Sequence, residues 1–156
     1  MNTPNLLDAI RVVKENERIA SERYADAAKM LGQVGKELFM QLSEFEKYHY
    51  EKITALEKSL EEKGDFINYA GKEFPLPPIF EIKAAQEPNK KSTMQVITEV
   101  LELEQQAERA YANLAAQLTD LQGHNMFIRL SEEEHKHYRI LTRAYKSLKD
   151  TGVWKW

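Results

Sequence analysis

A nine-residue segment occurs twice in this chain, 88 residues apart, and this repeat restricts the folds that the chain can adopt. Residues 42–50 read Leu-Ser-Glu-Phe-Glu-Lys-Tyr-His-Tyr, and residues 130–138 read Leu-Ser-Glu-Glu-Glu-His-Lys-His-Tyr. Each copy contains Glu-x-x-His, and on a helix this spacing places a carboxylate and an imidazole on one face, one turn apart. We therefore expect two matching helices that each carry a polar pair.

Apolar residues recur at alternating spacings of three and four in four parts of the chain, which is typical of the buried stripe of an amphipathic helix. The glycines at 32 and 35, a capping-box pattern at 92–95 and a break at 123–125 set the expected boundaries. The pattern predicts helices over residues 4–31, 36–63, 93–122 and 125–151. The connection over residues 64–92 is rich in proline, and a helical turn is expected near residues 80–85.

Titratable side chains interrupt each apolar stripe near the middle of its helix. They are Glu17, Glu46, His49, Glu104, Glu134 and His137. An ionised carboxylate is costly to bury without a partner, and the stripes contain no Lys or Arg beside these positions. Two divalent cations would balance four carboxylates, and two imidazoles would complete their ligand shells. A surface pair without metal would explain one Glu-x-x-His, but two copies on apolar stripes favour metal ligands.

The stripes form two copies of one helical hairpin. Glu17 and Glu104 are each followed seven residues later by a tyrosine, Tyr24 or Tyr111, and the Glu-x-x-His copy comes 29 or 30 residues after each glutamate. Short links make antiparallel helix pairs, whereas a long connection can traverse the length of a bundle. We therefore predict an all-α, ferritin-like four-helix bundle of two helical hairpins joined by a long crossover connection, with residues 1–156 as a single domain.

In these residues the chain resembles the ferritin-like diiron-carboxylate superfamily, nearest to its rubrerythrin-like branch. The resemblance implies two Fe ions, held by the six residues named above. It also implies that Tyr24 and Tyr111 donate hydrogen bonds to ligand carboxylates. Rubrerythrins usually carry a further glutamate where this chain has Ala107, and Glu108 is an additional candidate ligand. The chain has no cysteine, so it lacks the rubredoxin-like domain and would need an external electron donor.

The expected function is that of a non-haem diiron oxidoreductase, which would reduce H2O2 or O2 in oxidative stress or oxidise ferrous iron. The alternative is a non-catalytic metal-binding bundle that serves as an iron carrier, a sensor or an interaction module. Carboxylates and imidazoles do not select one metal, so Mn or Zn would also suit the site. A diiron hydroxylase acting on an organic substrate has the least support, because the sequence indicates no substrate pocket.

Charge and composition exclude several other classes of protein. The formal net charge of −3 gives no basic surface for nucleic acid. No apolar run approaches the ~20 residues that span a bilayer, and the N-terminus does not resemble a signal peptide. We expect a cytoplasmic homodimer without nucleic-acid or membrane partners. Trp154 and Trp156 are expected to cover apolar surface, either on their own bundle or at a dimer contact.

Overall fold

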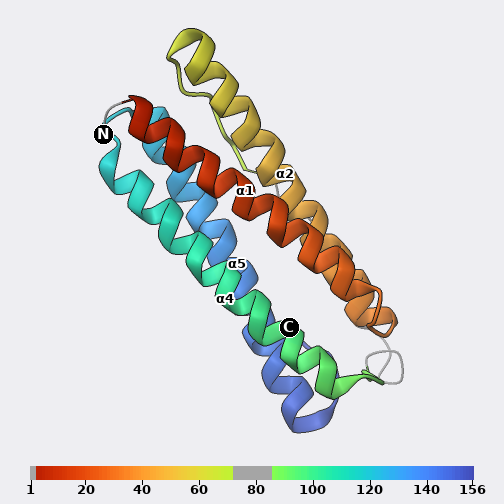
Figure 1. Cartoon of the computed structure of the whole chain (residues 1–156). Helices are drawn as coiled ribbons and strands as arrows, with labels where there is room; N and C mark the ends of the chain where they lie inside the picture. The colour runs from red at the N-terminus through yellow and green to blue at the C-terminus, as the bar shows by residue number, and fades with distance from the viewer. Residues whose placement is uncertain (1–2, 72–85) are drawn as a thin grey trace.

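The computed structural model describes residues 3–71 and 86–156 and is an all-α four-helix bundle (Figure 1). The helices are α1 (Thr3–Ala28), α2 (Gln33–Lys63), α4 (Lys90–Gln117) and α5 (Leu121–Thr151). The first two form one antiparallel hairpin and the last two form another, and α1 packs against α4 between the hairpins. The predicted architecture of two helical hairpins joined by a long connection is therefore confirmed.

The described parts of the connection contact α5 near both of its ends. Phe66 lies against Gly123 in the first turn of α5, and Tyr69 bonds to Glu133 further along that helix. At the other end, the backbone N–H of Glu87 donates to the carbonyl oxygen of Gly152 over 3.0 Å. The two described parts of the connection therefore lie against different parts of α5 and its C-cap. The helical turn expected near residues 80–85 falls outside the described residues.

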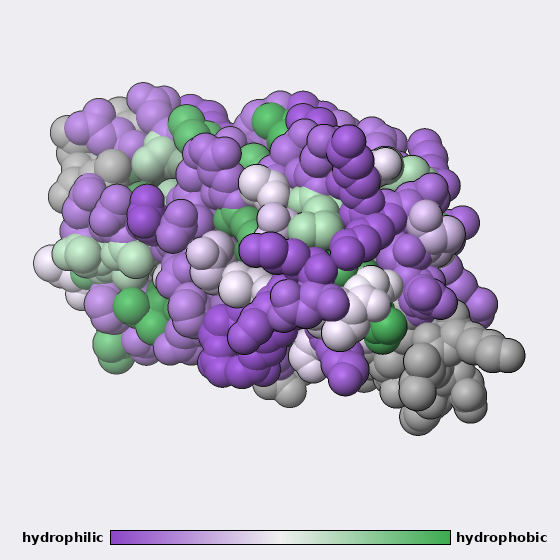
Figure 2. Space-filling view, turned by 90° about the horizontal axis from the view of Figure 1, so that it is seen from below, coloured by the Kyte–Doolittle hydropathy of each residue, from purple (hydrophilic) through white to green (hydrophobic). Residues whose placement is uncertain are grey.

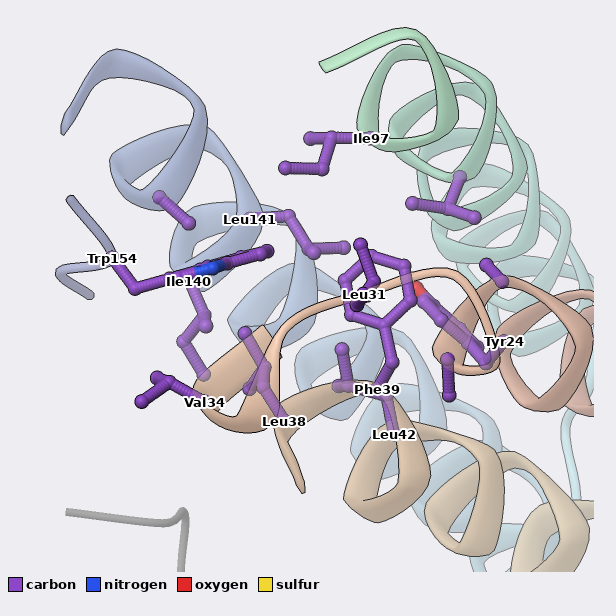
Figure 3. Packing of buried hydrophobic residues seen from close by; sticks show 14 of the residues in the cluster. Tyr24, Leu31, Val34, Leu38, Phe39, Leu42, Ile97, Ile140, Leu141 and Trp154 are labelled. Atoms are coloured by element: carbon purple, nitrogen blue, oxygen red, sulfur yellow. The ribbon is translucent and has the colours of Figure 1, made fainter. Parts of the chain in front are cut away.

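The buried apolar side chains form two clusters, one toward each end of the bundle. One is built around Phe39, Leu141 and Trp154, and the other around Ile10, Leu56 and Phe127. Trp154 reaches from the chain terminus into the first cluster, beside Ile140 and Leu141 (Figure 3). Trp154 is 1% exposed, so it covers apolar surface on its own bundle, which is one of the two alternatives that the sequence left open.

The face of the molecule drawn in Figure 2 is mainly polar, with apolar residues scattered over it. This distribution agrees with the amphipathic patterns, which leave one face of each helix for solvent. Among residues 3–71 and 86–156, no helix combines the length and the apolarity needed to cross a membrane.

The predicted break at residues 123–125 is wrong by several residues. Helix α4 ends at Gln117, and α5 begins after Asp120, whose side chain accepts a hydrogen bond from the Gly123 N–H at 2.9 Å. Asp120 is the N-cap that sequence reasoning missed. Gly123 is needed inside the helix, because a β-carbon there would lie 2.6 Å from the Phe66 ring. Leu121, the first residue of α5, is 73% exposed.

Two other helix starts also differ from the prediction. Helix α4 begins at Lys90 with Asn89 as its N-cap, so Ser92 lies inside the helix and does not cap it. Helix α2 begins at Gln33, directly after Gly32. Gly35 therefore lies within α2, where a β-carbon would come 2.5 Å from the Trp154 ring. This glycine makes room for a side chain from the chain terminus and does not form a turn.

Candidate metal centre

All six residues predicted as metal ligands meet at the middle of the bundle, between the two apolar clusters. Helices α1 and α4 each supply one glutamate, and α2 and α5 each supply a Glu-x-x-His pair. Their exposed fractions do not exceed 3%. Burying four ionised carboxylates together is costly unless some of them are protonated or they bind cations.

The six side chains form two overlapping groups, and in each group one ligand atom per residue lies within 4.8 Å of the others. The His49 subsite consists of Glu17, Glu46, His49 and Glu134, and the His137 subsite consists of Glu46, Glu104, Glu134 and His137. Glu46 and Glu134 belong to both groups. If each group held a metal ion, Glu46 and Glu134 would contribute to both sites, and Glu17 and Glu104 to one site each.

Both imidazoles present Nδ1 to the centre of the site. His49 Nδ1 lies 2.7 Å from Glu134 Oε1 and 3.4 Å from the nearest oxygens of Glu17 and Glu46. His137 Nδ1 lies 3.0 Å from Glu46 Oε1 and 3.6 Å from Glu104 Oε1. The donor atoms of both groups therefore converge from all four helices.

Several of these converging atoms have no hydrogen-bond partner within the described parts of the chain. They are Glu17 Oε2, Glu46 Oε2, His49 Nδ1, Glu104 Oε2 and Glu134 Oε1. His49 Nδ1 and Glu134 Oε1 are close, yet they lack the alignment of a hydrogen bond. Unsatisfied buried polar atoms are rare in proteins and call for an explanation such as an ion. Oxygen and imidazole donors with this geometry fit divalent metal ions.

Without metal, the carboxyl groups share protons unequally. Burial and the neighbouring charge of Glu46 raise the pKa of Glu17 well above its ordinary value, and burial and Glu104 do the same to the pKa of Glu134. Burial would also raise the pKa of Glu46, but its close contacts with Glu17 and with both histidines lower it well below that value. Glu46 is therefore the carboxylate that most readily stays ionised.

The surrounding carboxylates raise the pKa values of both histidines, whereas burial by itself would lower them. Burial alone would lower the pKa of His49, but the charge of Glu17 and the close carboxylates of Glu133 and Glu134 raise it well above its ordinary value. Burial likewise opposes protonation of His137, but Glu104 and Glu46 raise its pKa to about 9. Metal binding must displace these protons, because an imidazole ligates through a free lone pair.

Each predicted tyrosine bonds to a carboxylate on the opposite hairpin. The Tyr24 hydroxyl of α1 donates to Glu104 Oε1 of α4 at 2.5 Å, and the Tyr111 hydroxyl of α4 donates to Glu17 Oε1 of α1. These crossed bonds leave the second oxygen of each glutamate, Oε2, without a hydrogen bond. The tyrosines thus orient the two unshared carboxylates.

The serines of the repeated segment join the two helices of each hairpin beside the site. The Ser43 hydroxyl donates to the carbonyl oxygen of Ser21 at 2.8 Å, and the Ser131 hydroxyl donates to that of Glu108 at 3.0 Å. Both hairpins therefore use the same contact, which gives the repeated serine a structural role beside the site.

Glu108 does not reach the centre. Its Oε1 lies 3.0 Å from Nδ1 of His135 on the outer side of α5, and it belongs to neither ligand group. Sequence reasoning missed a different residue, Glu133, which is 6% exposed and lies 3.3 Å from His49 Nε2. Its position four residues before His137 was an available signal, because residues four apart share a helix face. Tyr69, which bonds to Glu133, comes from the connection and had no such signal.

A small cavity of about 20 Å³ reaches the site between α1 and α4. Its walls include the ligands Glu17, Glu46, Glu104 and Glu134, together with Asn16 and Gln106, whose side chains lie on the exposed faces of the two helices. A volume of this size accommodates about one water molecule.

Comparisons with protein-family models, with curated proteins and with solved structures find no match to the chain. The assignment of a metal centre therefore depends on the geometry of the site: buried Glu and His groups that could hold metal ions at the middle of a four-helix bundle.

Proposed function

We propose that this centre binds two iron ions and that the chain is a non-haem diiron oxidoreductase, which reduces H2O2 or O2 or oxidises ferrous iron. The observation that carries the proposal is the set of unsatisfied carboxylate and imidazole atoms that converge in two overlapping groups. Four carboxylates balance the charge of two divalent ions. Iron would supply the change of oxidation state that these side chains cannot themselves undergo.

The surrounding residues have roles that suit such chemistry. Tyr24 and Tyr111 hold the unshared glutamates in place, and the two apolar clusters exclude bulk water on both sides. The narrow cavity favours a small oxidant over an organic substrate, since its volume is about 20 Å³. Electrons would come from an external donor, because the sequence contains no cysteine for a second iron centre.

Iron binding and oxidation test this proposal directly. Anaerobic titration of the metal-free protein with Fe(II) should give about two irons per chain. Addition of H2O2 should then oxidise the bound iron, as followed by near-ultraviolet absorption, and a chemical reductant should permit repeated peroxide consumption. The variant Glu132→Gln is the control for changes outside the site and should bind iron as the wild-type protein does. Glu132 is exposed on α5, two residues before Glu134. A protein that binds no iron would contradict the proposal.

A non-catalytic metal carrier is the second candidate. The absence of cysteine favours it, because the chain has no thiolate-bound centre to pass electrons to the site. The ligand set also suits Mn or Zn. Retention of about two metal ions per chain without peroxide or O2 consumption would support the carrier over the oxidoreductase.

A further inference from the structure

The two halves of the metal centre differ at one position of the repeated segment. Glu133 occupies the place in the second copy that Phe45 occupies in the first, and both are buried. Each residue precedes its own helix's histidine ligand by four positions and contacts the histidine of the opposite hairpin. The internal symmetry of the bundle therefore places a carboxylate behind His49 and a phenyl ring behind His137.

Glu133 is positioned to fix the tautomer of His49. Its Oε1 lies 3.3 Å from His49 Nε2 and accepts a hydrogen bond from the Tyr69 hydroxyl at 2.5 Å. Its Oε2 lies 3.9 Å from Arg129 Nε. A proton on His49 Nε2 would point at this carboxylate, so the Nδ1 lone pair would face the ligand group. Such carboxylate–histidine contacts orient a ligating imidazole and strengthen it as a donor.

His137 has a different environment. The Phe45 ring centroid lies 4.4 Å from the imidazole centroid, with the two rings at 89°. A phenyl ring offers no carboxylate oxygen to an imidazole N–H. Within residues 3–71 and 86–156, the polar contacts of His137 all fall on its Nδ1. Its second nitrogen therefore lacks the support that Glu133 gives to His49.

We propose that the two subsites bind divalent cations unequally, that the His49 subsite fills first, and that Glu133 is the positioning residue that sets this order. The inference rests on the proposed metal centre and deepens it. The carboxylate ligands do not explain such an order, since Glu46 and Glu134 are shared and Glu17 and Glu104 are equivalent in the two hairpins. The asymmetry lies behind the histidines.

Titration of the metal-free protein with Co2+ tests the order, with calorimetry and visible absorption as readouts. The wild-type protein should bind two ions in two steps whose dissociation constants differ by at least about tenfold, the lower end of what a supporting carboxylate contributes. Glu133→Gln should weaken the first step by about 10- to 100-fold and leave the second nearly unchanged, so that the steps merge. Glu132→Gln, next along the chain but exposed, should behave as wild type.

A second measurement needs no variant. Crystals of wild-type protein with one equivalent of Co2+ should show anomalous scattering beside His49 and little beside His137. Equal occupancy of both subsites, first occupancy beside His137, or equal weakening of both steps in Glu133→Gln would overturn the inference. Failure to bind Co2+ would overturn the metal centre as well. Ordered binding without peroxide consumption would support the inference and contradict only the oxidoreductase.

Discussion

The four buried glutamates of the metal centre have the same chemistry but occupy two kinds of position. Glu46 and Glu134 belong to both ligand groups, whereas Glu17 and Glu104 each belong to one. The crossed tyrosine bonds reinforce the difference, because they fall on the two unshared carboxylates. Removing a shared ligand and removing an unshared ligand should therefore have different consequences.

Glutamine substitutions test these roles, since they keep the size of the side chain and remove its charge. Glu46→Gln or Glu134→Gln should reduce the bound metal from about two ions per chain to well below one, because both subsites lose a ligand. Glu17→Gln or Glu104→Gln should leave about one ion per chain. Metal content after dialysis, measured by elemental analysis, checks both. Equal losses in all four variants would contradict the assignment of shared and unshared ligands.

At the scale of elements, a buried carboxylate ties three segments together at one end of the bundle. Glu87 accepts hydrogen bonds from the backbone N–H of Gly32, at the start of α2, and from Asn89, at the start of α4, both at 2.9 Å. It also accepts one from the Trp154 indole N–H at 3.1 Å. This bond and the packing of Trp154 on Gly35 join the C-terminal segment to the start of α2.

Removal of the Trp154 side chain should therefore destabilise the whole bundle. Trp154→Ala would leave a cavity beside Phe39, whose ring centroid is 6.1 Å from that of Trp154, and would remove a donor from buried Glu87. We expect a loss of about 3–5 kcal/mol in the free energy of unfolding of the metal-free protein, measured by urea denaturation. Trp156→Ala, at a partly buried position, is the control and should cost much less. Similar losses in both variants would contradict this role of Trp154.

At the scale of the whole molecule, we expect the candidate metal centre to couple stability to pH. In the metal-free protein the pKa values of Glu17, Glu134, His49 and His137 are all raised on folding. Such groups contribute stability that is fully present below their unfolded pKa values and is lost as the pH rises through their folded values. Glu46 acts in the opposite direction, but its contribution is lost only as the pH falls through its lowered pKa.

The metal-free protein should thus become less stable as the pH rises from about 4.5, where unfolded glutamates ionise, to about 9, the raised pKa of His137. Urea denaturation across this range measures the effect. Saturating metal should reverse the trend, because deprotonated ligands bind metal more tightly. Stability of the metal-free protein that increases steadily with pH over the same range would contradict the proton sharing inferred for the site.

Much of the bundle and its ligand set could be predicted, because both depend on local periodicity. A spacing of three or four assigns each residue to a helix face, so the stripes identified four helices and placed Glu17, Glu104 and both Glu-x-x-His pairs on their inner faces. The helix ends were less accurate. Asp120 competes with Gly123 as the boundary signal, and only the position of Phe66 shows why a glycine is needed within α5.

By itself, then, the sequence determined the helices, their pairing and the six inward-facing candidate ligands, since a repeated periodic pattern carries that information. Only the tertiary structure decided which tyrosine bonds to which glutamate, and that Glu133 supports His49 while Phe45 lies against His137. The tertiary structure also buries Tyr69 and Glu87, which belong to a connection without periodic apolar residues. Such contacts join residues far apart in the chain, and their partners are set by how the packed helices face one another.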